Sequence, residues 1–578
     1  MDDRSKITIK KFKRDFFESE NQIAGIGTGS IGGKASGLAN IENFLAASFN
    51  HNEFPSVKIN IPSLVVIRTD VFDKFIEQNK LEKIAFSDER DSKIANAFQK
   101  AELPFEILGD LRTIANNVKT PLAVRSSSKL EDALFEPFAG IYSTKMLPNN
   151  QTSADERFVK LCEAIKLVYA SAFFKNAKEY FKATKNNIAD EKMAVIIQEV
   201  VGGKFSDKYY PHLSGVARSY NYYSFGRAKP EDGIVNLALG LGKTIVDGGI
   251  SWSYSPAYPK LSPPYSSISD LMKNTQNKFW AINMGKPPAY DPINEAEFMF
   301  EKDLADAEKD KTLKYLASTY NVSSDRVNMG IGISGPRILN FMMLLHFEDI
   351  PVNRIVKNML KFCEDKLNTP VEIEFAMTFD PLRFGLLQVR PMVVSDEKVD
   401  INESGIEEGN ILLGSENVLG NGVYSDIKNI VYVKPESFES KFTKEIAVEV
   451  ESINKDLINK KEPYLVIGFG RWGSSDPWLG IPVNWSNISG ASVIVEVATE
   501  NMNVDLSQGS HFFHNLNSFK VSYFSLSAIN KYKIDWKWLE NQAIISDQKF
   551  VRHIHLENPL NILVDGRKRL GIVEKSRE

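Results

Sequence analysis

The segment at residues 371–392, VEIEFAMTFDPLRFGLLQVRPM, constrains the fold more than any other part of the sequence. It contains two apolar, strand-like runs joined by a short turn, which predicts a β-hairpin. Residues two apart in a strand share one face. Glu372 and Glu374 should therefore point the same way, and Gln388 and Arg390 should do so on the partner strand. The apolar residues around them predict that both strands belong to a core.

Two carboxylates on one face of a strand repel each other unless a cation lies between them. Carboxylates that act together with substrate phosphates are the usual protein ligands of Mg²⁺. We therefore predict a metal site at Glu372 and Glu374. The alternative is an exposed strand face that carries an ordinary Glu–Arg pair.

Other segments predict a mixed α/β (α+β) protein. Two helices are expected, from 35 to 47 and from 156 to 174, where apolar residues recur every three or four positions. Further strands are rich in Val and Ile and are bounded by turn residues. They are expected at 63–67, 121–125, 193–201, 429–433, 464–468 and 491–497.

A shift in composition divides the chain. Residues 396–410 are acidic, polar and glycine-containing, and this pattern is typical of an interdomain linker. We expect a first domain at 1–395 and a C-terminal α/β domain at 411–578.

Two motifs have the chemistry of phosphate binding. Gly32 and Gly33 would let the backbone approach a phosphate at a helix start, and Lys34 would add a point charge. Arg125 ends a strand before three serines and could clamp phosphate oxygens, while Gly140 could let a loop close over a nucleotide. The alternatives are a plain turn and a surface arginine in a salt bridge.

Two other glycine-rich segments do not qualify as nucleotide motifs. The segment GLGKT at 240–244 ends like a P-loop, but Leu237 stands where the first glycine is required. The segment GFGRWG at 468–473 follows a strand, but a proline and no helix pattern come after it, so a Rossmann site is not expected.

Composition favours a cytoplasmic protein without nucleic-acid or membrane partners. The net charge is −4, whereas nucleic-acid binding usually needs a basic face. The two cysteines, Cys162 and Cys363, form no CxxC pair, so reduced thiols are expected. The N-terminus lacks the apolar region of a signal peptide, and no apolar run is long enough to span a bilayer.

Five segments in this order resemble the ATP-binding domain of the pyruvate phosphate dikinase and phosphoenolpyruvate synthase family. The resemblance covers residues 25–393. The segments are GGKASGLANI, AVRSSSKLEDALFEPFAGIY, MAVIIQEVV with SGVARS, LGLGKTIVDGG, and VEIEF with LLQVRPM.

The resemblance implies an ATP-grasp fold with two lobes, about 1–213 and 214–395, and ATP and Mg²⁺ between them. Lys34 and Arg125 would hold ATP phosphates, and Gln388 and Arg390 would contact them from the adjacent strand. Glu372, in place of the family's usual aspartate, would hold Mg²⁺ together with Glu374. Residues Gln198 and Glu199 would border the adenine. Lys243 stands where the family often has glutamate, which leaves the role of that loop open.

The resemblance also implies an ATP-dependent phosphotransferase. In this family ATP phosphorylates a histidine on a swivelling domain, and a TIM barrel then passes the phosphoryl group to pyruvate. Only 183 residues follow residue 395, too few for a TIM barrel of about 250. The chain is therefore expected to be either a piece of a longer enzyme or a shorter relative with another acceptor. The acceptor is unidentified, and a partner domain or protein could supply its site. The alternatives are a non-catalytic ATP-sensing module and an ATP-grasp ligase.

His511 is the predicted phosphoacceptor. Gln508-Gly509-Ser510-His511 stands where the family has its histidine loop, in a C-terminal block that resembles the swivelling domain. The sequence departs from the family here, because Phe512 and Phe513 replace small residues. His511 and His514 could instead form part of a metal site, or His511 could be a structural histidine.

Overall fold

The computed structural model describes most of the chain. The described residues are 9–18, 22–131, 140–184, 186–222, 224, 226–261, 265, 267–392, 394, 399, 401, 407–474, 476–499, 510–527 and 530–575. The expected linker at 396–410, the loop before Gly140 and residues Gln508 and Gly509 therefore lie wholly or largely outside the described part.

The first lobe is built on a six-stranded sheet with the strand order β1-β2-β4-β7-β5-β6. Its strands are β1 (Lys10–Lys11), β2 (Ile23–Ile26), β4 (Leu64–Ile67), β7 (Met193–Glu199), β5 (Leu122–Ser128) and β6 (Thr144–Leu147). Its helices are α1 (Gly32–Ser48), α2 (Thr69–Gln78), α3 (Glu82–Ala85), α4 (Asp91–Lys100), α5 (Phe105–Asn117), α6 (Ala154–Ser171) and α7 (Lys175–Ala183).

Both faces of this sheet are buried, as β4 illustrates. Val65 and Ile67 pack in one core with α2, α4, α5 and α6, whereas Leu64 and Val66 pack in a second core with α1. Successive side chains of a strand point to opposite faces, so the run LVVI can serve two cores only if helices cover both sides.

The second lobe contains the predicted hairpin. Strands β18 and β19 pair antiparallel in a six-stranded sheet with the order β12-β11-β10-β18-β19-β3. The strand β3 comes from the first part of the chain and joins this sheet at its edge. The bounds are β12 (Trp252–Tyr254), β11 (Ile234–Ala238), β10 (Leu213–Arg218), β18 (Val371–Phe379), β19 (Leu382–Pro391) and β3 (Lys58–Asn60).

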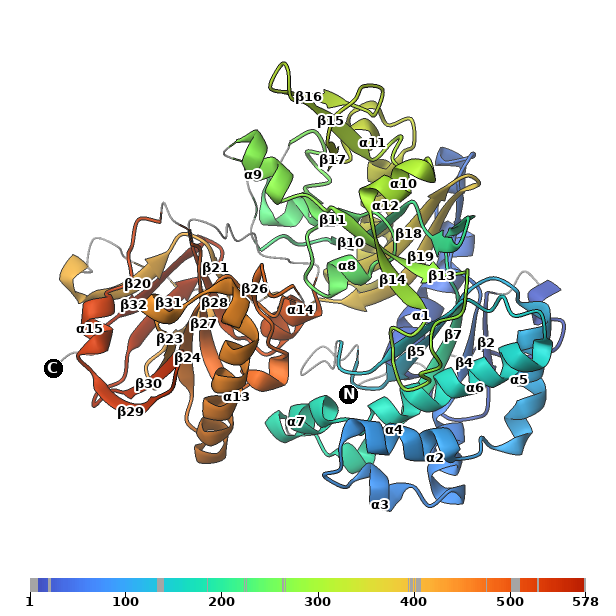
Figure 1. Ribbon diagram of the computed structural model, residues 1–578, viewed down its shortest axis with the longest axis horizontal. Helices are drawn as coiled ribbons and strands as arrows, with labels where there is room; N and C mark the ends of the chain where they lie inside the picture. Colours follow the sequence, from blue (N-terminus) through green and yellow to red (C-terminus); the bar gives the residue numbers. More distant parts are fainter. Residues whose placement is uncertain are drawn as a thin grey trace.

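Two smaller sheets and several helices complete this lobe (Figure 1). The sheets contain β8 (Gly203–Phe205), β9 (Lys208–Tyr210), β13 (Lys278–Asn283), β14 (Met299–Asp303), and β15 (Ala317–Asn321), β16 (Arg326–Met329), β17 (Arg337–Leu339). The helices are α8 (Lys243–Val246), α9 (Ile268–Lys273), α10 (Leu304–Lys309), α11 (Met342–Phe347) and α12 (Val352–Leu367).

The C-terminal domain has a seven-stranded sheet in which β23, β24, β27 and β28 run parallel. Its strands are β21 (Val418–Leu419), β28 (Ser522–Leu526), β27 (Ala491–Val497), β24 (Tyr464–Phe469), β23 (Asn429–Val433), β30 (Val551–His555) and β29 (Ala543–Asp547). The other elements are β20 (Ile411–Ser415), β22 (Asn421–Tyr424), β25 (Arg471–Trp472), β26 (Gly480–Ile481), β31 (Asn561–Asp565), β32 (Leu570–Glu574), α13 (Thr443–Lys460), α14 (His511–Ser518) and α15 (Trp536–Glu540).

The C-terminal domain contacts the first lobe through α7. Lys175 of α7 lies 3.0 Å from the carboxylate of Glu451 on α13. The ring of Tyr180, also on α7, lies 5.5 Å from that of Phe519. One apolar core therefore extends from the first lobe into the C-terminal domain.

His553 on β30 should make stability depend on pH. It is 5% exposed and shares a hydrogen bond of 3.0 Å with Asn429. Burial, and then the nearby positive charge of Lys460, lowers the pKa of His553 to about 4. The unfolded chain binds the extra proton near pH 6.5, so the stability that neutral His553 contributes is present above that pH and is lost as pH falls through 4.

We expect His553 to account for about 2–3 kcal/mol of the loss in unfolding free energy between pH 7 and pH 4. Thermal unfolding of wild type and H553Q at both pH values would measure this loss. H51Q, in the first lobe, is the control. Equal pH dependence in wild type and H553Q would contradict the prediction.

Candidate functional site

A cavity of about 290 Å³ lies between the sheets of the two lobes, and strands β5, β7, β10, β18 and β19 line it. Its volume is at the lower end of the range for small-molecule sites. Eight of the predicted site residues line this cavity: Lys34, Arg125, Gly140, Gln198, Glu199, Glu374, Gln388 and His511. The other four, Gly32, Gly33, Glu372 and Arg390, are not part of its lining.

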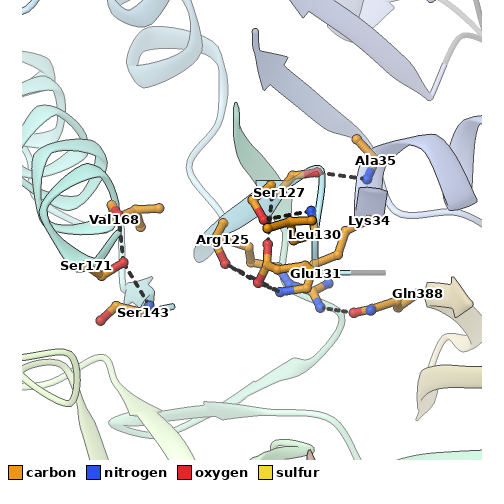
Figure 2. A network of polar contacts seen from close by, with 12 residues as sticks. Lys34, Ala35, Arg125, Ser127, Leu130, Glu131, Ser143, Val168, Ser171 and Gln388 are labelled. Carbon is orange, nitrogen blue, oxygen red and sulfur yellow. Dashed lines mark hydrogen bonds and ion pairs between the residues drawn. The ribbon is translucent and has the colours of Figure 1, made fainter. Parts of the chain in front are cut away.

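The start of α1 is held against the end of β5, as Figure 2 shows. The Ala35 amide donates to Ser127 Oγ at 3.1 Å, and that hydroxyl donates to the Ile31 carbonyl at 2.8 Å. A Cβ on Gly32 would lie 1.7 Å from the Ser127 carbonyl oxygen, and Gly32 has a φ of +75°. Gly32 is therefore needed for close backbone packing, which brings Lys34 to the cavity.

Lys34 is nearly buried and is paired with a carboxylate. Its Nζ lies 2.7 Å from Glu131 Oε1, and the same oxygen accepts a hydrogen bond of 2.7 Å from Ser126. The backbone amide of Ser128 donates to the other carboxylate oxygen at 2.9 Å. Sequence reasoning did not assign a role to Glu131. A lysine held in this way has a fixed position at the cavity wall.

Arg125 connects the two lobes at the centre of the site (Figure 2). Its guanidinium donates to Gln198 in its own sheet at 3.2 Å. Across the cavity it donates to Gln388 Oε1 at 2.8 Å and to the Leu387 carbonyl at 3.1 Å, and it lies 3.6 Å from the Glu374 carboxylate. The alternative of a surface arginine is excluded, because its side chain is only 13% exposed.

The hairpin places its two glutamates in different surroundings. Glu374 pairs with Gln388 in the strand register and lines the cavity. Glu372 pairs with Arg390 and is 1% exposed, and its carboxylate accepts hydrogen bonds from Arg390 and Arg218. Burial by itself raises the pKa of Glu372, but the two guanidinium groups outweigh this effect and hold the pKa below its usual value.

The predicted metal pair therefore needs correction. Both acceptor oxygens of Glu372 are used by arginines, so this carboxylate balances buried charge and does not face the cavity. Glu374 is the member of the pair that could reach a ligand. Sequence reasoning missed Arg218, although a charged residue in the apolar strand SGVARS was a usable signal.

The cavity has a less polar part beside the end of β7. Val200, Val201, Leu241 and Met299 line it together with Glu199, whose carboxylate is held by two hydrogen bonds from Arg383 at 2.9 and 3.0 Å. A flat apolar ring system would suit such a wall, because ligand pockets combine apolar walls with a few placed polar groups.

The residue that departs from the family pattern, Lys243, also lines the cavity. Its Nζ lies 2.6 Å from Asp247. Burial lowers the pKa of Lys243, but the charge of Asp247 more than compensates and raises it above its usual value. For the neighbouring carboxyl of Glu295, burial raises the pKa, and the charge of Lys243 offsets only part of that rise. This wall therefore offers a cation flanked by two carboxyl groups.

His511 reaches the cavity from the C-terminal domain. It is the first residue of α14 and not part of a loop, which differs from the sequence expectation. Gly140 of the first lobe lies directly against it, because a Cβ on Gly140 would be 2.8 Å from the imidazole carbons. The fold thus brings His511 to the same cavity as Lys34, more than 400 residues away in the chain.

Within the described residues, His, Cys, Asp and Glu side chains form no cluster of three or more that could hold a metal. None of the helices among those residues has the length and apolar character needed to cross a membrane. The cavity instead joins cations, several carboxyl groups and an imidazole, and its cations suit a phosphate-bearing ligand.

Residues 28–409 match the family described as pyruvate phosphate dikinase, AMP/ATP-binding domain. The chain belongs to this family. Its mixed α/β architecture agrees with the ATP-grasp fold expected from the sequence, and membership supports ATP binding in this part of the chain.

A curated relative is an uncharacterised phosphotransferase, YvkC, from Bacillus subtilis (strain 168). It is 26% identical over 191 residues, which is 33% of this chain and 20% of that protein. The aligned region therefore covers about a fifth of the relative's length.

Removing Lys34 or Arg125 should weaken ATP binding. Loss of one charge-assisted contact costs on the order of 1.5–3 kcal/mol, which is roughly 10- to 150-fold in Kd. Calorimetry on K34A and R125A would measure this change. K278A removes a more exposed lysine that pairs with Glu301 on a neighbouring sheet and should bind ATP like wild type. Unchanged affinity in K34A and R125A would contradict the assignment.

Proposed function

We propose that this protein is a cytoplasmic, Mg²⁺-dependent phosphotransferase that transfers a phosphoryl group from ATP to His511, and from there to an acceptor of unidentified class. The observation that carries the proposal is the presence of His511 in the lining of one cavity with Lys34, Arg125 and Glu374. The two unpaired cysteines support the proposed location.

The adenine would lie against the apolar wall beside Gln198 and Glu199, and the phosphates would point toward Lys34 and Arg125. Both cations are already held in place by protein partners. Preorganised cations stabilise the charge that develops on transferring phosphate oxygens without a further reorganisation cost.

Glu374 would hold Mg²⁺. Its register partner Gln388 accepts a hydrogen bond from Arg125 and would keep that arginine beside the phosphates. A magnesium ion commonly uses one or two carboxylates and completes its shell with substrate phosphates and water, so a site with few protein ligands fits this ion. When bound, Mg²⁺ would neutralise charge on the phosphates.

The transfer step is an in-line displacement. The ring nitrogen of His511 that carries no proton forms a bond to a phosphorus atom of ATP. The bond from that phosphorus to the bridging oxygen breaks, and its electron pair leaves with the departing phosphate group. Because the attacking nitrogen has no proton, none must leave before the new bond forms.

Labelled ATP tests the transfer. We expect label from either [γ-³²P]ATP or [β-³²P]ATP to enter the protein with Mg²⁺ present, to be lost in acid and to map to the His511 peptide. H511N should abolish incorporation but leave ATP affinity within about twofold, and H514N is the matched control. ATP binding without incorporation would favour the ATP-sensing alternative, and direct formation of an acyl phosphate on an added acid would favour a ligase.

The two hairpin glutamates should have separable effects. E374Q should lose most Mg²⁺-dependent ATP consumption because it removes the accessible carboxylate. E372Q removes the negative charge that balances the buried guanidinium groups of Arg218 and Arg390. Breaking a buried ion pair in this way costs roughly 3–5 kcal/mol of unfolding free energy. Thermal unfolding and metal titration of both variants would test this expectation. Full Mg²⁺-dependent activity in E374Q would place the metal elsewhere.

A further inference from the structure

Arg218, the last residue of β10, has an unusual environment. It is 2% exposed, and its Nε donates to Glu372. Its two terminal nitrogens, Nη1 and Nη2, are buried and have no hydrogen-bond partner in the part of the chain that the structure describes. Burying unpaired donors of a charged group is costly. An ion pair with Glu372 alone therefore does not explain this residue.

Another side-chain contact of Arg218 comes from the C-terminal domain. The guanidinium carbon lies 4.9 Å from the centre of the Phe513 ring. A guanidinium over an aromatic face makes a cation–π contact, which strengthens when both groups are shielded from water. Phe513 is 3% exposed, so this contact is shielded.

The position of Arg218 links the cavity to α14. In the strand register Arg218 pairs with Glu372, which in turn pairs with Arg390. Glu374 lies two residues farther along β18, a spacing of roughly 7 Å on the same face. On the other side, Phe513 is two residues beyond His511. The Arg218–Phe513 contact thus joins the strands beside the cavity to the helix that carries His511.

Two glycines from other parts of the molecule also lie against the first turn of α14. Gly140 of the first lobe lies against His511, and Gly473 of the C-terminal domain lies against Phe512, where a Cβ would come within 2.3 Å of the ring. Both glycines have positive φ, +71° and +77°, so a side chain at either would also strain the backbone. Small shifts of α14 would therefore displace His511 from its contact with the first lobe.

We propose that Arg218 is a positioning residue that docks α14 through the ring of Phe513 and so sets His511 against the cavity. The role assigned to His511 rests on the proposed function, whereas the docking contact does not. Arg218 itself is not part of the cavity lining, so its effect should fall on phosphoryl transfer and not on ATP affinity. Displacement of a reacting group by about 1 Å can cost on the order of 100-fold in rate.

The test uses the full chain and four variants at the contact. R218M removes the charge but keeps a long side chain, and R218K keeps the charge without the planar group. F513L removes the aromatic face, and F513Y keeps it. F550L removes an equally buried ring of the same domain at a distance from α14 and serves as the control.

Two measurements keep docking apart from chemistry. Hydrogen exchange of the amides of residues 511–518 reports docking of α14, and single-turnover incorporation at saturating Mg-ATP reports transfer. We expect R218M and F513L to speed the exchange roughly 2- to 30-fold, the range of one cation–π contact. They should slow incorporation by at least that factor with ATP affinity within twofold of wild type. F513Y should restore most of the wild-type exchange rate and incorporation rate. R218K should give rates between those of R218M and wild type, and F550L should leave the exchange rate and the incorporation rate unchanged.

The double variant R218M/F513L should be no worse than the more affected single variant, because both changes remove one contact. Additive losses, equal effects of F513L and F513Y, or unchanged exchange in R218M would each overturn the proposal. If wild type incorporates no phosphoryl group, the proposed function fails, and the exchange data alone decide whether Arg218 docks α14.

Discussion

The carboxylate of Glu372, buried between two guanidinium groups, fixes the register on which the candidate site depends. Strands β10, β18 and β19 each contribute one of the three residues. A slip of one residue in any strand would turn its charged group to the opposite, apolar face, at a large electrostatic cost. The same register places Glu374 beside Gln388. Gln388 accepts a hydrogen bond from Arg125, so the register also determines a contact with the other lobe.

The cavity combines positive and negative groups, and most of them are already paired. Lys34 with Glu131, and Lys243 with Asp247, are close ion pairs on the cavity wall. A phosphate entering the cavity must therefore compete with a carboxylate for each lysine. Under the proposed function, a polyanion that carries its own cation would meet this competition better than a bare anion, because its cation would interact with the carboxylates while its phosphates approach the lysines.

The sequence allowed the hairpin and the start of α1 to be predicted, because apolar periodicity and local turn residues determine these elements. The strand at 121–125 was also found, but its end was wrong, because β5 continues through the three serines to Ser128 and pairs there with β7. The sequence could not separate Glu372 from Glu374. The two residues have the same type and face. Glu372 is distinguished by its burial between Arg390 on β19 and Arg218 on β10, and these contacts depend on strand pairing. The helix at His511 was also missed, since its contacts come from Gly140 and Gly473, which are distant in sequence. Contacts of this kind depend on tertiary packing and leave no periodic signal.

The aromatic contact between Tyr180 and Phe519 limits how far the two domains can be separated or exchanged. Because the first lobe and the C-terminal domain share one apolar core across α7, neither can be exchanged for an unrelated module without exposing buried rings. Separating the chain at the segment between the two domains would thus uncover apolar surface on both parts.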